Sequence, residues 1–597
     1  MANPSTVIRA EAMLISELFH MGQFEVPWHQ RHYDWAVSDV RALLSDIDDT
    51  IERDQKTYFL GAIMLIENGS EQWLINDGQQ RMITISLVNA VLCNRFSHEK
   101  PGSQREGHAL RLLFDLDDKG VWTLSDSDQY VPRISPPAND KMQYHQMIRG
   151  NTIGTNGLLT AAWDEINRFF DSMDIKRAEQ YFQFLLRNLE VACLWVPLHI
   201  DANAVYETLN FRGKKLDDWD LIRNYLYSHF GSDSESEKKN SVHADLERIG
   251  IRIPNTKKAS EYIRSCLQCK FGFLRKDQFY REAREAIRSQ KGKVPTPDES
   301  LPDYVLDLTR QLALPESLEL YLRITAANPE PDFIRAFEVA SDTVNSRRNL
   351  AVFLYELRDY KVTLPLIFSI LTWFIQEKDG RRKRRIARIA HKNLSRLATF
   401  VLRTAFVAPK FEPSNFEEKF SNYAYVIASA EDLPDTEFAD FLRDCDQSAF
   451  GVLNDTRFRN AMNEISMSGS TKNKKFLLGI NGYQQKDFRL LNPRQCSLEH
   501  VLPESPIHWS GWDGFSDDGI NASDWVTRIG NLTLMGPTDN KPGVKYNSSF
   551  EKKRPSYQES AIKLTRDLGK LAEWSPDHIR KRQKRMATLA VKIWAFE

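Results

Sequence analysis

The sequence lacks a hydrophobic run long enough to cross a membrane. Its longest strongly apolar stretch, residues 362–375, is shorter than the ~20 residues that a membrane helix needs. We expect this stretch to form a buried helix with Pro365 in its first turn. The N-terminus has no basic segment followed by an apolar one, which is the pattern of a secretory signal. These absences predict a cytoplasmic protein with no membrane partner.

Cysteine is scarce, with six in 597 residues. Four stand alone in mostly apolar segments, which favours buried free thiols in a reducing compartment: Cys93, Cys193, Cys445 and Cys496. Cys266 and Cys269 form a CxxC pair, but no second pair or pair of histidines lies near it in the sequence. A structural zinc needs four such ligands, so the pair alone does not predict one and its role stays open.

An excess of either charge is also absent, because 80 basic residues face 81 acidic ones. A surface for a polyanion must therefore be a local patch.

The length of 597 residues exceeds what one hydrophobic core supports. We expect three parts, at residues 1–235, 236–465 and 466–597.

The hydrophobic pattern predicts a predominantly helical α+β fold. Short strands are expected at residues 24–27, 58–66 and 73–75, and helical spacing begins at Arg81. Residues 150–230 and 303–465 have helical patterns, whereas the last part has short strand-like runs before a final amphipathic helix. The polar segment 231–260 and the proline-rich segment 291–303 are expected to be linkers or surface excursions.

Near the C-terminus, the order of a few polar residues suggests hydrolytic chemistry. Glu499 and His500 stand side by side in SLEHVLPES, and Asn531 follows in RIGNLTLMG before a strand-like run. Asn540 and Asn547 come next. Phosphodiester hydrolysis needs a base to activate water, a cation to neutralise developing charge, and a group that holds the base in place. A strand that carries adjacent Glu and His residues can point them in different directions and divide the first two tasks.

A second group of motifs lies near the N-terminus. The segment DGQQR falls between a predicted strand and a predicted helix, where Gly78 permits a tight turn and the helix start favours a phosphate. Arg81 could donate to that phosphate, and Asp77 could help to hold a cation. No glycine-rich GK[ST] loop is present. Two further polar segments contain Gln30, Arg31 and Tyr33, and Asn210, Gly213, Asp220 and Asn224.

Taken together, EHVLP, GNLTL, the two asparagines and FEKK, with DGQQR upstream, resemble the GmrSD-type restriction endonucleases, which are related to the BrxU-like and SspE-like phage-defence effectors. The resemblance implies a ParB/sulfiredoxin-like N-terminal domain, a helical middle and a C-terminal HNH nuclease of the ββα-metal (His-Me finger) class. It covers roughly residues 1–230 and about 120 residues at the C-terminus.

The resemblance also implies roles for individual residues. His500 would be the general base, Asn531 would orient it, and Glu499 with Asn540 would face the metal, with Asn547 left open as the alternative. The third position of the HNH motif carries asparagine rather than histidine here, which favours Mg²⁺ or Mn²⁺ over zinc. The DGQQR residues Asp77, Gly78, Gln79, Gln80 and Arg81 would bind a nucleoside triphosphate, with GTP favoured because SspE-like members hydrolyse it. Gln30, Arg31 and Tyr33 are candidates for a pocket that senses modified DNA.

Basic clusters supply the candidate DNA contacts. On a helix, Arg381, Arg384, Arg385 and Arg388 share one face while Ile386 and Ile389 pack inward. Contact with phosphates and a merely solvated face are equal alternatives here. Lys552 and Lys553 follow the asparagines, and a second basic run spans 578–586 beside the nuclease motif.

These patterns predict a nucleotide-regulated DNA endonuclease that restricts modified or phage DNA, and the choice between a phosphorothioate and a modified base stays open. One alternative is a nucleotide-gated DNA-binding regulator with a vestigial nuclease. Another is an abortive-infection toxin that cuts nucleic acid without reading a modification. A homo-oligomer, the preferred nucleotide and the choice between nicks and double-strand breaks stay open.

Overall fold

The computed structural model describes residues 7–27, 30, 32–68, 71–116, 120–151, 157–197, 205, 217–230, 236–291, 300–328, 330–346, 348–408, 411–448, 451–466, 470–485, 495–509, 512–515, 521–537, 539 and 547–597. The chain divides into two compact units, Met1–His229 and Phe230–Glu597. The second unit therefore contains both of the parts that the sequence predicts as separate, residues 236–465 and 466–597.

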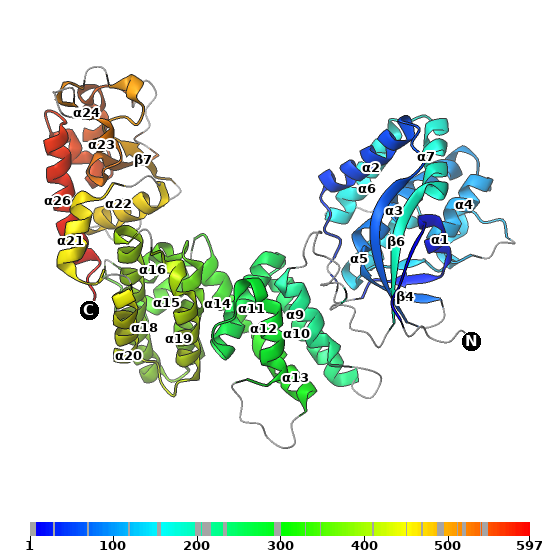
Figure 1. Cartoon of the computed structure of the whole chain (residues 1–597), viewed down its shortest axis with the longest axis horizontal. Coiled ribbons are helices and arrows are strands. Elements are labelled where there is room, and N and C mark those ends of the chain that lie inside the picture. The colour runs from blue at the N-terminus through cyan, green and yellow to red at the C-terminus, as the bar shows by residue number, and fades with distance from the viewer. Residues whose placement is uncertain are drawn as a thin grey trace. The chain divides into compact units, whose positions relative to one another are not determined.

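The first unit contains a mixed sheet. Its strands are β1 (Arg9–Leu14), β2 (Gln23–Glu25), β3 (Tyr58–Glu67), β4 (Gln72–Asp77), β5 (Ile134–Ser135) and β6 (Leu189–Val196). Their order in the sheet is β1-β6-β3-β4-β2-β5, and Figure 1 labels β4 and β6. β3 and β4 form an antiparallel pair, whereas β6 lies parallel to β3 and antiparallel to β1. The three expected strands correspond to β2, β3 and β4.

The sequence prediction is wrong at β6, which lies in a region expected to be helical. Along this strand Leu189, Val191, Cys193 and Trp195 are buried and alternate with partly exposed residues. That alternation is the period of a strand. The segment forms a strand because β1 and β3, far away in the chain, pair with its two edges. β1 was not predicted either.

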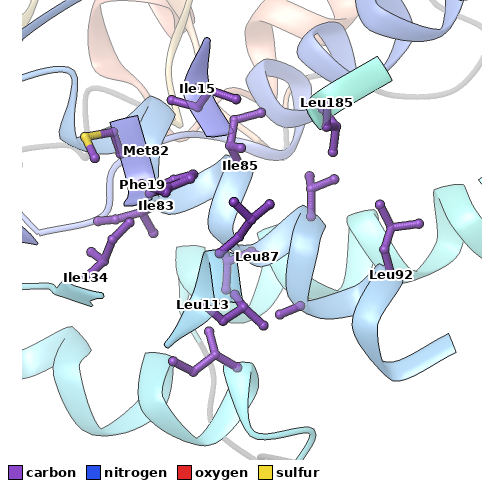
Figure 2. Packing of buried hydrophobic residues seen from close by; sticks show 14 of the residues in the cluster. Ile15, Phe19, Met82, Ile83, Ile85, Leu87, Leu92, Leu113, Ile134 and Leu185 are labelled. Carbon is purple, nitrogen blue, oxygen red and sulfur yellow. The ribbon is translucent and has the colours of Figure 1, made fainter. Parts of the chain in front are cut away.

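Helices pack around this sheet: α1 (Ile15–His20), α2 (Val37–Glu52), α3 (Gln79–Glu99), α4 (Gln104–Leu113), α5 (Ala138–Ile148), α6 (Leu158–Asp171) and α7 (Ile175–Arg187). The last described helix of the unit is α9 (Asp218–Ser228). α3 is the central one, since it is buried along most of its length. Met82, Ile83, Ile85 and Leu87 of α3 lie among Phe19, Leu113 and Ile134 from neighbouring elements (Figure 2). This packing fixes the DGQQR turn, because the turn begins the helix.

The second unit begins with twelve described helices: α10 (Ser236–Arg252), α11 (Thr256–Phe271), α12 (Phe279–Arg288), α13 (Leu301–Leu312), α14 (Pro315–Thr325), α15 (Pro331–Ser341), α16 (Leu350–Leu357), α17 (Leu364–Gln376), α18 (Gly380–Val407), α19 (Glu417–Ser429), α20 (Thr436–Ser448) and α21 (Asp455–Glu464). α17 is the expected buried helix, with Pro365 in its first turn. The linker expected at 231–260 is wrong for α10, because Val242, Leu246 and Ile249 recur at helical spacing and are buried. Among the described helices, none is long and apolar enough to span a membrane.

The rest of the second unit contains α22 (Ser470–Gln484), β7 (Ser497–His500), α23 (Ser523–Val526), β8 (Leu532–Met535), α24 (Phe550–Gln558), α25 (Lys563–Arg566) and α26 (Pro576–Ile593). Short 3-10 helices lie at η1 (Leu124–Gln129), η3 (Lys276–Gln278), η4 (Lys361–Thr363), η5 (Pro413–Phe416), η6 (Pro506–His508), η7 (Asp513–Phe515), η8 (Ile529–Asn531) and η9 (Leu568–Lys570). β7 and β8 are antiparallel, and the long helix α26 runs against α21 and α22 (Figure 1).

A buried arginine joins the helical region to the C-terminal segment. Arg403 of α18 has a fully buried side chain, and its Nε donates to the carbonyl oxygen of Trp594 at 2.8 Å. Its other nitrogens donate to the Leu453 carbonyl at 2.9 Å and to Asp455 at 2.7 Å. Because a buried guanidinium without these acceptors would be costly, the network ties α18, α21 and the end of α26 together.

Candidate functional site

The predicted C-terminal motif lies on the antiparallel pair β7–β8. Glu499 and His500 end β7, and His500 is opposite Leu532 in the register. The backbone N–H of Val501 donates to the carbonyl oxygen of Asn531 at 2.9 Å and continues the ladder past the strand end. α24 follows in sequence and supplies side chains to β7. The described elements are thus two antiparallel strands and a helix.

Asn531 is fully buried and its amide is occupied by other groups than the imidazole. Its Oδ1 accepts from the Leu502 backbone N–H at 2.8 Å and from Nε1 of Trp574 at 3.0 Å. Its Nδ2 donates to the carbonyl oxygens of Leu502 and Val526, both at 3.0 Å. This differs from the expectation that Asn531 orients the ring of His500. The amide instead fixes the turn that follows His500.

Glu499 is held by two side chains of α24. Its Oε1 accepts from Nζ of Lys553 at 2.9 Å and from the hydroxyl of Tyr557 at 2.9 Å. Nζ of Lys553 also donates to the carbonyl oxygens of His500 at 2.9 Å and Val501 at 3.0 Å. The expectation that Lys553 contacts DNA is wrong, because its side chain is fully buried. Lys552, the adjacent residue, is exposed and stays a candidate.

His500 is only partly exposed, and burial lowers the pKa of its imidazole. The carboxylates of Glu504 and Glu499 oppose this shift, while the ammonium group of Lys553 adds to it. The net direction keeps the ring neutral at neutral pH, which is the form that accepts a proton.

The predicted metal side is only partly described. Asn540 lies outside the described residues, and Asn547 is exposed. Within the described ranges, no three His, Cys, Asp or Glu side chains converge in a way that would hold a metal. Glu499 is the oxygen donor beside His500. Both of its described hydrogen bonds use Oε1, so a cation would meet Oε2.

The DGQQR turn in the first unit has the predicted geometry. Gly78 has φ +92°, a conformation that favours glycine, and caps the start of α3. A Cβ there would lie 2.9 Å from the Ile63 side chain. Asp77 and Arg81 form a partly exposed ion pair at 3.3 Å across this turn. The guanidinium of Arg81 also occupies the space next to Gly61, where a side chain would collide with it.

The pocket candidates of the preceding loop are fastened to that same turn. Gln30 donates from Nε2 to the Asn76 carbonyl at 3.2 Å. Gln80 accepts from the Asp34 N–H and donates to the His32 carbonyl, both at 3.0 Å. The hydroxyl of Tyr33 lies 2.7 Å from Oγ1 of Thr84.

Among these candidates, Gln79, Gln80, Gln30 and Tyr33 are buried. Arg31 lies outside the described residues. The structure therefore brings the two motifs together but gives Gln80 and Tyr33 structural contacts. Asp77 and Arg81 are the more exposed pair.

The third N-terminal motif is described only in α9. Asp220 and Asn224 are buried there, and Nη2 of Arg223 donates to Asp220 at 3.3 Å. Burial lowers the pKa of Arg223, which marks a guanidinium deep in the protein. Asn210 and Gly213 lie outside the described residues.

The predicted basic face is present at the start of α18. Arg381, Arg384, Arg385 and Arg388 are exposed, while Ile386 is fully buried and Ile389 is partly buried. Arg385 forms an ion pair with Asp432, whose carboxylate offsets the positive charge of this face locally.

Both sites lie in segments that match models of known protein families. The family model of the GmrSD restriction endonuclease N-terminal domain matches residues 15–227, and that of the C-terminal domain matches residues 452–589. Together the two matches cover more than half of the chain. The chain belongs to the GmrSD restriction endonuclease family. No curated protein matches it.

Membership of this family supports a role of the chain as a restriction nuclease, with DNA as its partner. DGQQR and its helix lie within the N-terminal match, and β7, β8, α24 and most of α26 lie within the C-terminal match. The helices from α10 to α20 lie between the two matches.

Sequence reasoning missed Tyr557, and it matched Trp574 and Arg582 to the closing helix of the GmrSD-type module without giving them a role. Tyr557, Trp574 and Arg582 contact Glu499, Asn531 and the flanking carbonyls, but their spacing to the motif carries no periodic signal. The signal that could have found them is a polar or aromatic residue on the apolar face of a predicted helix.

The CxxC pair lies on α11, where Cys269 donates to the Pro365 carbonyl at 3.4 Å. Burial raises the pKa of the Cys266 thiol to about 12.

Proposed function

We propose that this restriction endonuclease cuts DNA by metal-dependent HNH chemistry, with His500 as the general base. The observation that carries the proposal is the end of β7, where a partly buried His500, whose pKa burial lowers, adjoins a carboxylate that α24 holds in place. Hydrolysis of a phosphodiester needs a base and a cation, and this strand offers a candidate base next to an anchored oxygen donor for a cation.

In this mechanism Nδ1 or Nε2 of His500 takes a proton from the attacking water. Lys553 and Tyr557 fix one oxygen of Glu499, so Oε2 would hold a divalent cation such as Mg²⁺ or Mn²⁺ together with Asn540 or Asn547. When bound, the cation neutralises charge on the scissile phosphate. Asn531 positions the turn after His500 through Leu502 and so keeps the base at the strand end.

The first unit, proposed to be ParB/sulfiredoxin-like, would bind a nucleoside triphosphate at the DGQQR turn, with GTP favoured. Arg81 and Asp77 are the groups offered to the phosphates and their cation, because both are partly exposed beside the start of α3. The adjoining loop at 30–35 would then report modified DNA to this turn through Gln80. In this proposal the nucleotide controls the nuclease during antiphage defence.

The test is cleavage of plasmid and phosphorothioate DNA by the purified chain with Mg²⁺ or Mn²⁺ and each of the four NTPs. We expect cleavage that disappears with a chelator and changes with one nucleotide. Metal-independent cleavage would contradict the chemistry. DNA binding without any cleavage would instead favour a regulator with a vestigial nuclease, and equal cutting of all substrates without nucleotide would favour a toxin.

A further inference from the structure

A cavity of about 270 Å³ lies in the C-terminal part of the second unit, between the end of α22, the α25–η9 segment and α26. Its polar lining consists of Gln484, Asp567, His578, Lys581, Arg582 and Arg585. This basic stretch of α26 is the second patch noted in the sequence. The volume is small for a drug-sized ligand but suits a compact anion with part of an attached group.

Arg582 is partly buried, whereas the other long cationic side chains of the lining, Lys581 and Arg585, are exposed. Nη1 of Arg582 donates to the carbonyl oxygens of Gly530 and Leu532, both at 2.7 Å. Its Nη2 is buried and has no hydrogen-bond partner in the described structure. Burial lowers the pKa of Arg582 to about 9, which is the sign of a buried charge that lacks a close counter-ion. A guanidinium stays charged in proteins, so the missing acceptor is a cost that a ligand can remove.

The neighbouring charges leave the cavity positive. Asp567 is the acidic group in the lining, but its carboxylate is occupied by Lys563 at 3.1 Å and Lys570 at 2.6 Å. Lys581 pairs with Asp577 at 2.7 Å in an exposed bridge, which is weak in water. Arg585 is exposed and follows Lys581 by four residues, about one helical turn, so the two share a side of α26.

Gln484 supplies a second unpartnered atom. Its Oε1 is buried and has no hydrogen bond among the described residues, although the amide lines the same cavity as Arg582. A ligand with a protonated oxygen would satisfy Oε1, and a half-turn of the amide would instead present two N–H donors. Both Arg582 and Gln484 therefore point to a ligand that is rich in oxygen.

We propose that this cavity binds a phosphate group through Nη2 of Arg582, with Gln484 and the side chains of Lys581 and Arg585 around it. The site is separate from His500 and from the DGQQR turn. Because Arg582 also holds the carbonyls on either side of Asn531, phosphate here stabilises the segment that positions the turn after His500. That effect on cleavage rests on the proposed nuclease function, whereas the binding does not.

The test measures binding of inorganic phosphate to the full chain by titration calorimetry in a chloride buffer. Replacement of Arg582 also frees two carbonyls and can unfold the segment, so the double variant Lys581→Gln/Arg585→Gln and the single variant Gln484→Leu carry the test. We expect the double variant to weaken phosphate binding about tenfold or more, because the loss of even one charge-assisted hydrogen bond has an effect of that size. Gln484→Leu should weaken it as well.

Three controls give the result its meaning. Lys584→Gln removes an exposed charge of α26 that does not line the cavity, and it should bind phosphate as the wild type does. Arg81→Ala and His500→Ala disable the other two candidate phosphate sites, so phosphate binding at the cavity should persist in both variants. Phosphate affinity that is the same in the wild type, the double variant and Gln484→Leu would overturn the proposal.

The source of the phosphate is decided by competition with a short DNA duplex in the His500→Ala background. Competition that the double variant abolishes assigns the cavity to a phosphodiester of DNA. Phosphate binding that the duplex leaves unchanged assigns it to a free phosphate or a nucleotide. Either outcome supports the site, and both stand even if the wild-type chain fails to cut DNA.

Discussion

The ammonium group of Lys553 lies 2.9 Å from Oε1 of Glu499, inside the protein. It also donates to the carbonyl oxygens of His500 and Val501, so one side chain of α24 holds the whole end of β7. Burial lowers the pKa of Lys553, while Glu499 acts to raise it. The pair thus behaves as a structural bridge next to the proposed base.

Lys553→Met is predicted to destabilise the C-terminal part by about 3–5 kcal/mol, the cost of removing one partner of a buried ion pair. Glu499 and two carbonyls would lose their donor, and cleavage would fall with the loss of geometry. Calorimetry of the full chain measures the stability. The matched control is Lys552→Met, an exposed neighbour, which should weaken DNA binding with little change in stability. Equal melting of the two variants would refute the bridge.

Asn531→Ala is predicted to lower the cleavage rate without moving the acid limb of the pH–rate profile. The amide contacts Leu502, Val526 and Trp574 rather than the imidazole, so its loss disorders the turn and leaves the pKa of His500 governed by burial. Each unpaired buried group should also cost ~1–3 kcal/mol of stability. A clear displacement of the acid limb would show instead that Asn531 acts on the ring directly.

Glu504→Gln is predicted to shift the acid limb to lower pH. The base must be neutral, so activity falls as the pH drops through the pKa of His500, which burial places below its ordinary value of 6.5. The Glu504 carboxylate raises that pKa, and its removal lets the pKa fall further. Rates measured from pH 4.5 to 8 at saturating metal test this. An unmoved limb, or one at higher pH, would contradict it.

Arg81→Ala is predicted to weaken nucleotide binding and to change DNA cleavage, although Arg81 is in the other unit. Coupling of this kind requires a ligand that binds two global states with different affinity, and it is reciprocal. Nucleotide should therefore alter DNA affinity by the factor by which modified DNA alters nucleotide affinity. Arg53→Ala, at an exposed arginine that follows the end of α2, is the control. If nucleotide does not change DNA affinity, modified DNA does not change nucleotide affinity, and Arg81→Ala cleaves normally, the two domains act independently.

Local patterns predicted much of this structure. The turn at Gly78, the strand before it, α17 and the pair of strands around EHVLP and GNLTL could each be predicted, because their signals lie within a few residues. β6 could not, since its strand character comes from pairing with β1 and β3. Lys553 was misassigned for a similar reason. A lysine in a basic run reads as exposed, and only the position of α24 against β7 reveals that it is buried.

The most direct test of the account is the rate at which His500→Ala nicks supercoiled DNA, compared with the wild type and with His508→Ala. His508 lies in η6, a few residues after β7, and has no part in the proposed chemistry. The account predicts a loss of ~10²–10⁴ in rate for His500→Ala, with melting temperature and nucleotide binding unchanged, and near-normal cleavage by His508→Ala. Cleavage by a folded His500→Ala protein at the wild-type rate would contradict it.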